Sequence, residues 1–427
     1  MSVVDSPVPQ QLLSRLYQAA LDAADPMKVV PPHLPQPPRG RTVVVGVGKA
    51  AAAMARAVEA HWPGPLSGVV VVPPGASLPL ENIRVIEGSH PIPDENSVAG
   101  AEALLQSVTN LSSDDLVIAL VSGGGSALCA KPAEGLSLAD KQSITSKLLV
   151  RGASISEINT VRRHLSAIKG GRLAAHSYPA KVVTLLISDI PGDDPSMIAS
   201  GPTLPDDSTC ADALAVLVRY AITDMSNVLQ ALEEGRWESV KSGDARLVRN
   251  SHHIIATAWN GLHAASLQAI HEGVACHILS DAMEGEARDL AKAHAAIALS
   301  VVQRNVPFVT PCVLLSGGEA TVTVRGSGRG GRNTEFILAL ALALEGQKGA
   351  DRIHAISAGT DGLDGRSGAA GAWMGPQTIN QATAQGYSAV SSLDKNDSAT
   401  FLEAASALVH TGPTFTNIND FRAILIS

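Results

Sequence analysis

The sequence predicts an α/β protein made of two unlike α/β domains with largely parallel sheets. Short apolar runs that suit buried strands alternate with stretches that suit helices, which is the pattern of a parallel sheet covered on both faces. The chain has 427 residues, whereas one hydrophobic core usually serves no more than about 250–300. Hydrophobic residues make up 45% of the chain and charged residues 17%, a composition typical of a globular, core-forming protein.

The first half of the chain is predicted to form a Rossmann-like domain over residues 1–240. Its strands are expected at residues 42–45, 68–72, 83–86, 116–121 and 181–187, and its helices at 10–24, 50–61, 97–105, 138–151 and 155–165. The apolar pattern weakens between Tyr220 and Asp244, which places the predicted domain boundary near residue 240.

The second half is predicted to form another α/β domain over residues 241–427. Its strands are expected at residues 252–257, 274–279, 312–316, 320–325 and 353–358, and its helices at 260–271, 284–303 and 333–345. A last strand over 423–426 could join either sheet. Ligands of parallel sheets bind at the carboxyl ends of the strands, so the turns after the strands are the places to look for chemistry.

Composition and charge exclude several classes of partner. Aromatic residues are 3% of the chain, too few for the stacking platforms of proteins that bind single-stranded nucleic acid. A net charge of −8 disfavours nucleic acid and anionic membranes. The longest apolar runs, such as 336–344, fall short of the roughly 20 residues that span a bilayer, and residues 1–10 lack the features of a signal peptide. We expect a cytoplasmic protein, and a homodimer remains open.

The four cysteines also argue for a reducing compartment. Cys129, Cys210, Cys276 and Cys312 are scattered, with no C-x-x-C pair. This spacing fits free thiols better than a disulfide framework or a zinc site.

The most prominent turn follows the apolar strand 116–121. It consists of Ser122, Gly123, Gly124, Gly125 and Ser126. Glycine lets backbone N–H groups approach a ligand closely, and a glycine turn between a strand and a helix points those groups at an anion, usually phosphate. A tight turn without a ligand is the alternative. The similar run at 316–318 is expected to be a turn that need not touch a ligand.

A second turn, at residues 45–51, matches the G-x-G-x-x-[GA] pattern of dinucleotide-binding proteins. A dinucleotide site also needs an acidic residue at the end of the next strand to hold the ribose. That strand ends in Val-Pro-Pro-Gly at 72–75, which disfavours an NAD(P) site. A lysine inside the turn fits anion recognition better, because the dipole at a helix N-terminus repels an unpaired cation. We therefore assign Lys49 to binding a phosphate or a carboxylate.

The segment 159–172 carries five basic or potentially basic side chains in an acidic chain: Arg162, Arg163, His164, Lys169 and Arg172. We expect about three of them to lie on a solvated helix face. His164 and His90 are expected to be structural, because nothing pairs either of them with a nucleophile.

Acidic turns follow two of the predicted strands. Asp189 and Asp193 lie just after the strand 181–187, and Asp361 follows the strand 353–358. Phosphoryl transfer needs Mg²⁺ held by one or two carboxylates, or a carboxylate base near the attacking hydroxyl. The alternative is a turn in which aspartate caps backbone amides.

Arginines in a glycine loop give the second strongest anion signal. The loop 326–331 leads into a predicted helix and is followed by Arg332 and Asn333. A cation at a helix N-terminus is unfavourable unless an anion accompanies it. Gly331 and Asn333 are therefore assigned to phosphate binding together with Arg332.

These motifs, taken in order, resemble the class II glycerate kinase family, whose C-terminal part is called the MOFRL domain and whose members are often named hydroxypyruvate reductase. The resemblance runs from about Leu12 to Ser427. The matching stretches are residues 46–51, 89–94, 122–127, 159–172, 188–203, 330–335, 360–362 and 411–414. This chain departs from the family's pattern at Thr334, where glutamine is more usual, and at Phe415, where glycine is more usual.

The resemblance implies phosphorylation of D-glycerate with ATP and Mg²⁺, at the 2-hydroxyl, in a cleft between the two domains. It implies that Lys49 and Arg332 are the main active-site cations. On this hypothesis the loops 122–126 and 326–331 hold phosphates. Asp189 is the metal ligand or the hydroxyl base, with Asp193 and Asp361 as competing metal ligands. An NAD(P)H-dependent hydroxypyruvate reductase and a non-catalytic sugar-acid binding protein are the alternatives.

Overall fold

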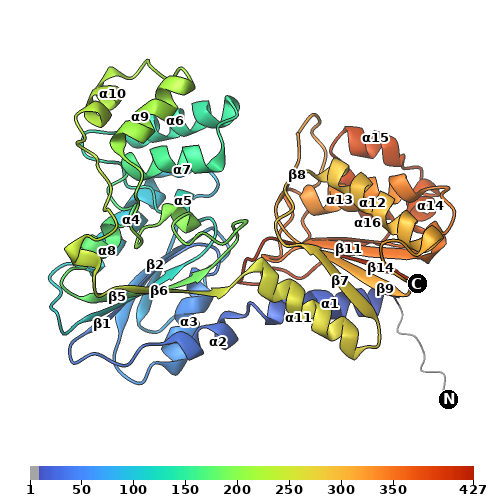
Figure 1. Cartoon of the computed structure of the whole chain (residues 1–427), viewed down its shortest axis with the longest axis horizontal. Helices are drawn as coiled ribbons and strands as arrows, with labels where there is room; N and C mark the ends of the chain where they lie inside the picture. The colour runs from blue at the N-terminus through green and yellow to red at the C-terminus, as the bar shows by residue number, and fades with distance from the viewer. Residues whose placement is uncertain (1–8) are drawn as a thin grey trace. The chain divides into compact units, whose positions relative to one another are not determined.

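The computed structural model describes residues 9–427, which divide into two compact units (Figure 1). The inserted unit comprises residues 26–188 and 193–255. The terminal unit comprises residues 9–25, 189–192 and 256–427. The chain thus enters the inserted unit after one helix and returns to finish the terminal unit.

A six-stranded sheet forms the centre of the inserted unit. Its strands are β1 (Thr42–Val47), β2 (Ser67–Val72), β3 (Ile83–Glu87), β4 (Leu116–Val121), β5 (Lys181–Ile187) and β6 (Ser251–Ala256). They lie in the order β3-β2-β1-β4-β5-β6, and the pairs from β3 to β5 are parallel. This is the Rossmann order, which confirms the fold predicted for the first half of the chain.

The helices of the inserted unit cover this sheet and form a further layer. They are α2 (Pro26–Val29), α3 (Ala51–His61), α4 (Glu95–Ser107), α5 (Gly125–Leu128), α6 (Leu138–Val150), α7 (Ile155–His164), α8 (Arg172–His176), α9 (Cys210–Arg219) and α10 (Ser226–Glu233), with short 3₁₀ turns at Pro31–His33, Ile198–Ser200 and Ala245–Leu247. Helices α6, α7, α9 and α10 share an apolar core of their own that includes Ile144, Val161 and Leu217, and Figure 1 shows them as a separate layer.

The terminal unit contains a second six-stranded sheet, which is mixed. Its strands are β7 (Ala275–Ser280), β9 (Cys312–Ser316), β11 (Ile353–Gly359), β12 (Gly371–Met374), β13 (Leu408–Val409) and β14 (Asp420–Ile426), in the order β13-β12-β11-β14-β9-β7. Of its paired strands, β7 and β9 alone run parallel within residues 9–427. The prediction of largely parallel sheets is therefore wrong for this unit. The physical reason is that β14 enters between β11 and β9 and runs against both of them.

Helices pack on both faces of the second sheet. They are α1 (Pro9–Asp22), α11 (Ala258–His271), α12 (Ala287–Arg304), α13 (Arg332–Leu344), α14 (Thr378–Thr383), α15 (Ala389–Asp394) and α16 (Ser398–Ala404). Alternate strand residues face opposite ways, so Val313 and Leu315 join the core under α1 and α11, while Leu314 joins the core under α12 and α13 (Figure 1).

The division into units differs from the predicted domains in the placement of β6 and in that of α1. Strand β6 joins the first sheet instead of opening the second domain, which moves the crossing to residues 255 and 256. Helix α1 packs with α11 through Leu12, Leu16 and Leu262. The last strand, β14, lies inside the second sheet. The expected strand 320–325 is reduced to β10 (Ala320–Thr321), which pairs with β8 (Gly285–Glu286).

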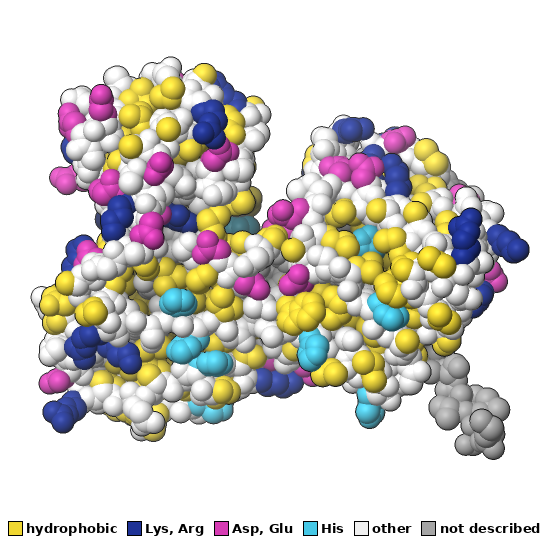
Figure 2. Space-filling view, viewed as in Figure 1, with side chains coloured by type: hydrophobic (Ala, Val, Ile, Leu, Met, Phe, Trp, Pro, Cys, Tyr) yellow, Lys and Arg dark blue, Asp and Glu magenta, His cyan; other side chains and the backbone are white. Residues whose placement is uncertain are grey.

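The surface carries charges of both signs. Figure 2 shows basic and acidic side chains interspersed over the face in view. None of the helices described between residues 9 and 427 combines the length and the apolar character needed to cross a membrane.

Candidate functional site

The glycine-rich turn 122–126 joins β4 to α5 in the inserted unit. Gly124 has φ +80°, in the left-handed region that favours glycine. A Cβ on Gly125 would lie 2.6 Å from Cβ of Ala199, so the third glycine is required by packing. The Ser122 hydroxyl accepts a hydrogen bond from the Ala50 amide at 3.0 Å. The turn is thereby fixed to the neighbouring turn after β1.

Three amides of this turn are left open. Within residues 9–427, the N–H groups of Gly123, Gly124 and Ser126 have no hydrogen-bond acceptor. Gly124 and Ser126 are half-buried. Backbone N–H groups without a partner at the end of a strand are suited to an anion, as the sequence predicts for this turn.

In the turn after β1, by contrast, the backbone amides are already hydrogen-bonded. The amide of Gly48 donates to Val71 O at 3.0 Å, that of Lys49 to Gly123 O at 2.9 Å, and that of Ala51 to Gly48 O at 3.2 Å. Together with the bond from Ala50 to Ser122, these contacts occupy the amides that a dinucleotide pyrophosphate would need. The match to the dinucleotide pattern is therefore explained by packing between two turns.

Lys49 lies directly beside the glycine-rich turn and is half-buried. An ideal Cβ on Gly124 would lie 3.5 Å from Lys49 Cγ and 3.2 Å from His90 Cδ2. The predicted cation and the predicted phosphate-binding turn are thus adjacent in the inserted unit. His90, which we expected to be structural, lies at the same turn.

A chain of polar side chains leads from this turn to α7. The hydroxyls of Ser126 and Ser200 are 2.9 Å apart, and Ser200 donates to Asn159 Oδ1 at 3.0 Å. Ala199 and Ser200 have φ of 52° and 60°, and a residue other than glycine in this region costs on the order of 1–3 kcal/mol. Ser200 and Asn159 were missed as site residues, although both lie in segments that support the family resemblance.

The basic segment 159–172 is more buried than predicted. Arg163 (7% exposed) pairs with Asp206 at 2.9 Å, and His164 and Lys169 are also buried. Arg172 donates to backbone carbonyls, including Arg163 O at 2.8 Å. Only Arg162 and Arg172 keep partial exposure. The expectation that about three of the five lie on a solvated face is therefore wrong, because α7 packs against α6 and α9 in the helical layer.

Arg332 opens α13 in the terminal unit and is held by two carboxylates. Its Nε lies 2.7 Å from Asp420 Oδ1 and its Nη1 lies 2.6 Å from Glu319 Oε1. Burial lowers the pKa of Arg332, but Asp420 and Glu319 outweigh burial, and the pKa is raised. The anion that we expected beside this arginine is thus present in the protein itself.

The N-terminus of α13 is capped by a buried carboxylate. Asp364 accepts from the amides of Asn333 and Thr334, each at 2.9 Å, and from the Thr334 hydroxyl at 2.8 Å. Burial raises the pKa of Asp364 to about 6, although these hydrogen bonds oppose the rise. Thr334, at which the resemblance expects glutamine, therefore forms part of the cap. The Asn333 amide is not available to a phosphate, and its side-chain Nδ2 donates to Asp420 at 2.9 Å.

The loop 326–331 is satisfied by the segment 395–398. The amides of Gly326, Gly328 and Arg329 donate to Asn396 Oδ1, Lys395 O and Asp397 Oδ1, and the Gly331 amide donates to the Thr334 hydroxyl at 2.9 Å. A Cβ on Gly331 would lie 2.4 Å from Asp364. The glycines of this loop are explained by close packing, and the idea that the loop as a whole holds phosphate through its amides is wrong, because most of those amides are already bonded.

The predicted acidic residues fall in both units. Asp189 and Asp361 lie in the terminal unit, and Asp193 lies in the inserted unit with φ 53°. Asn417 donates to Asp189 Oδ2 at 2.8 Å, and the Asp361 carbonyl accepts from the Thr414 amide at 3.3 Å. Asp189 and Asp361 therefore approach the same segment, 414–419, from distant parts of the sequence.

Phe415 lies in this segment and has φ 59°. This is the left-handed conformation that glycine adopts without strain. The resemblance expects glycine here, so the backbone keeps a conformation suited to glycine while carrying a large, half-buried side chain.

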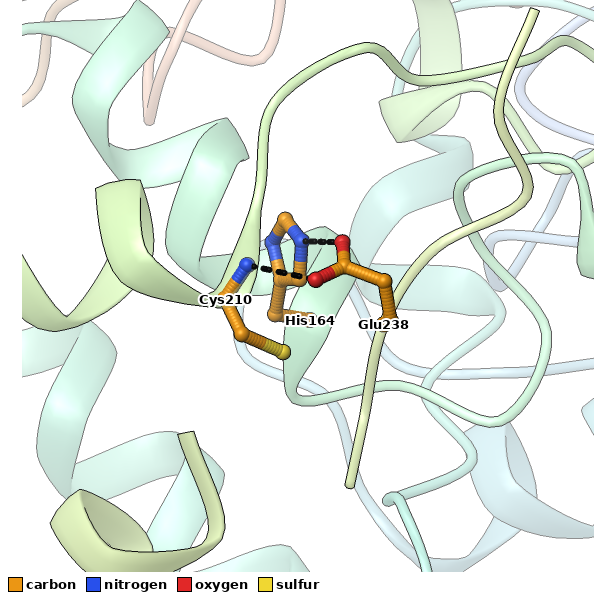
Figure 3. A group of neighbouring side chains, drawn as sticks. All are labelled: His164, Cys210 and Glu238. Carbon is orange, nitrogen blue, oxygen red and sulfur yellow. Dashed lines mark hydrogen bonds and ion pairs between the residues drawn. The ribbon is translucent and has the colours of Figure 1, made fainter. Parts of the chain in front are cut away.

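Within residues 9–427, one group of three or more potential metal ligands has its ligand atoms close together: His164, Cys210 and Glu238, within 4.8 Å (Figure 3). Glu238 lies 3.2 Å from His164 Nε2 and accepts from the Cys210 amide at 3.1 Å. Lys241 also binds this carboxylate at 2.5 Å. Burial and the nearby Glu238 raise the pKa of Cys210 to about 11. A protonated thiol and a carboxylate paired with lysine describe a structural network that fixes the start of α9.

Comparisons with known proteins agree with the resemblance. A family model described as a domain of unknown function (DUF4147) matches residues 12–233, and the MOFRL family model matches residues 312–420. A D-glycerate 2-kinase from Thermotoga maritima is 40% identical over 413 residues, covering 96% of this chain and 97% of that protein. A protein from Agrobacterium vitis that is named as a hydroxypyruvate reductase is 49% identical over 420 residues, covering 98% of this chain and 94% of that protein.

A solved structure extends the likeness to the fold. The crystal structure of the glycerate kinase from Thermotoga maritima matches with a TM-score of 0.87 at 40% identity, covering 98% of this chain and 99% of that chain.

Proposed function

Because this chain belongs to the glycerate kinase family and matches the DUF4147 and MOFRL models, we propose that it is an ATP-dependent kinase that phosphorylates D-glycerate. The reaction transfers the γ-phosphoryl group of ATP to a hydroxyl oxygen of glycerate and releases ADP. The 2-hydroxyl is the proposed acceptor, in line with the name of the Thermotoga relative.

One observation carries the proposal: the two glycine-rich turns of the inserted unit differ in their free amides. The turn after β1, which a reductase would use for the dinucleotide, has its amides bonded to the protein, whereas the turn 122–126 keeps three open. In addition, β2 ends at Val72 and is followed by Pro73 and Pro74, without a carboxylate for a ribose. These features favour phosphate binding at 122–126 over hydride transfer from a nicotinamide cofactor.

Lys49 and Arg332 are proposed to stabilise the charge on the transferred phosphoryl group or to hold the glycerate carboxylate. Phosphoryl transfer depends mainly on positioning and on neutralising charge. Lys49 is supported by its place beside the open amides. Arg332 has 25% of its side chain exposed while Asp420 holds its Nε, so that it is oriented by a buried carboxylate and still accessible.

Asp189 is proposed as the hydroxyl base or metal ligand, with Asp361 and Asp193 as further ligand candidates. Mg²⁺ prefers carboxylate oxygens. The Asp189 carboxylate contacts the segment 414–419 through Asn417, and the backbone carbonyl of Asp361 contacts the same segment at Thr414. When bound, Mg²⁺ would neutralise phosphate charge. The chain's own contribution here is orientation, since Asn417 holds the Asp189 carboxylate.

The test is a coupled assay on the purified protein with D-glycerate, ATP and Mg²⁺, with NMR identification of the product. Release of ADP together with 2-phosphoglycerate supports the proposal. A product phosphorylated at the 3-hydroxyl would keep the kinase and correct its regiochemistry. NADH oxidation with hydroxypyruvate and no ADP release would replace the kinase by the reductase.

A further inference from the structure

Three cationic side chains of the inserted unit lie in the interior without a carboxylate. Lys141 on α6 is 6% exposed, and its Nζ has no hydrogen-bond acceptor within residues 9–427. Lys169 is 2% exposed, and its Nζ donates to the carbonyl of Cys129 at 2.7 Å. Arg162 on α7 is half-buried, and its guanidinium has no hydrogen bond or ion pair in the described part of the chain.

The charges around this group are of one sign. The groups that act on the pKa of Lys141 are Lys169, Cys129, Arg162 and Arg172, and burial is the largest influence. The three cations lower the pKa of Lys141, and only the Cys129 thiol opposes them. The hydrogen bonds of Arg172 go to backbone carbonyls, and the carboxylates of Asp206 and Glu238 that act on the pKa of Arg172 are not among the groups that act on Lys141. Burial likewise lowers the pKa of Lys169 to about 8.

Such an arrangement is unfavourable in the ligand-free protein. Burying an ionised ammonium without a partner is costly, and a buried charge is normally paired. The neighbouring Arg163 shows the usual solution, since it pairs with Asp206 at 2.9 Å. Lys141, Arg162 and Lys169 all depart from this rule. Together they lack a counter-ion, and the described residues do not supply one.

The cationic group adjoins the open amides of the turn 122–126. Arg162 lies one turn after Asn159 on α7, and residues three apart share a helix face. Asn159 is linked through Ser200 to Ser126 in the turn. Lys169 binds the carbonyl of Cys129, the residue that directly follows α5. The group is therefore connected to the segment 122–129 directly through Lys169 and, by way of Asn159 and Ser200, through α7.

We propose that Lys141, Arg162 and Lys169 form an anion-binding group that takes a phosphate oxyanion beside the turn 122–126. The inference rests on the proposed function for the source of that phosphate, a nucleotide, but not for phosphate binding itself. Arg162, as the least buried of the three, meets the anion directly, and the two lysines supply positive charge behind it. Because burial lowers the pKa of Lys169 to about 8, Lys169 is expected to take up a proton when the anion binds.

The experiment measures binding by titration calorimetry at pH 8 with three probes: inorganic phosphate, a non-hydrolysable ATP analogue and D-glycerate. Variants are Arg162→Gln and Lys141→Met, with Arg56→Gln as the matched control, since Arg56 is exposed on α3 in the same unit. We expect at least a tenfold loss of affinity for phosphate or the analogue in both test variants and none in the control. Measurements in Tris and in Hepes should reveal proton uptake by the wild-type protein.

Stability of the ligand-free protein gives a second, independent readout. Lys141→Met removes an unpaired buried charge, so its thermal midpoint should rise while its phosphate affinity falls. A merely structural lysine would give a lower midpoint. If Lys141→Met does not fold, the half-buried Arg162→Gln still decides the question.

The outcomes distinguish a nucleotide from a free phosphate as the source of the bound anion. They also distinguish this inference from the proposed function. Loss of affinity for the ATP analogue assigns the group to the nucleotide, and loss for inorganic phosphate alone assigns it to a free phosphate. Unchanged affinity for both in folded Arg162→Gln overturns the inference, as does selective loss of D-glycerate binding. A protein without kinase activity that loses phosphate affinity in Arg162→Gln would retain the inference and remove the proposed function.

Discussion

Asp420 offers a direct comparison between the arginine that we propose as catalytic, Arg332, and a structural one, Arg422, because both share its carboxylate. Arg332 Nε lies 2.7 Å from Oδ1, and Arg422 Nη2 lies 2.7 Å from Oδ2. The side chain of Arg332 is 25% exposed, whereas that of Arg422 is 1% exposed. The perturbation is replacement of each arginine by glutamine in turn. Its purpose is to separate loss of turnover from loss of stability.

The contacts set the expected magnitudes. After Arg332→Gln, Asp420 keeps Arg422, the side chain of Asn333 at 2.9 Å and the Ala320 amide at 3.1 Å. A partly exposed pair of this kind contributes about 1 kcal/mol. Arg422→Gln breaks a fully buried pair, which typically costs about 3–5 kcal/mol. On turnover the order is reversed: losing a cation at a phosphoryl-transfer site costs on the order of 10³-fold, or about 4 kcal/mol.

The assay combines urea unfolding with steady-state kinetics of ADP release for both variants. We expect Arg332→Gln to lose turnover on the order of 10³-fold with a small change in the free energy of unfolding. Arg422→Gln should lose mainly stability and less than about tenfold in turnover of the folded protein. Equal losses of stability in the two variants would show that Arg332 is structural, and near-normal turnover of Arg332→Gln would refute its catalytic role.

Three further predictions concern other parts of the molecule. Lys49→Ala should lower kcat by on the order of 10³-fold, while the exposed control Arg56→Gln keeps it, and near-normal turnover of the alanine variant would remove Lys49 from the site. Gly125→Ala places a Cβ 2.6 Å from that of Ala199, so we expect a loss of about 1–3 kcal/mol in urea unfolding, and an unchanged midpoint would show that the turn can move. Because the pKa of Asp364 is raised to about 6 from 3.8, its stabilising effect is complete below pH 3.8 and is lost as the pH rises through 6. The unfolding free energy of wild type relative to Asp364→Asn should therefore fall by about 2.4 kcal/mol between pH 4 and pH 7, and a pH-independent difference would contradict this sign.

Local patterns in the sequence predict most elements of this fold. Strands β1, β4 and β5 are continuous apolar runs that are buried along nearly their whole length, and the alternation of strands and helices leads to the Rossmann order. Strand direction in the second sheet could not be predicted in this way. An apolar run such as β14 looks the same whether its neighbours are parallel or antiparallel, and its place between β11 and β9 depends on contacts far away in the sequence.

The site was predictable where the chemistry is local and not where it depends on distant partners. Strand β4, the glycines that follow it and the open amides all lie within residues 116–126. Arg332 does lie beside an anion, as its place at a helix N-terminus predicts, but that anion is the carboxylate of Asp420, which is distant in the sequence. The capping of α13 by Asp364 could not be predicted either, because Asp364 is also distant from the start of α13 in the sequence. Burial of the basic segment was missed because the apolar helix α9 that covers it comes much later in the chain.

The position of α1 has a consequence for how the protein is made. Its apolar residues Leu12, Leu13 and Leu16 pack against α11 and the second sheet, yet residues 26–255 are synthesised before α11 appears. At about 5–20 residues per second, this leaves the first helix waiting for about 10–50 s on the ribosome while the inserted unit folds. Strand β14, which lies between β11 and β9, is synthesised after both of them. A fragment that starts after residue 255 would lack α1 and leave the apolar surface of α11 uncovered, so the terminal unit cannot be obtained by a single cut.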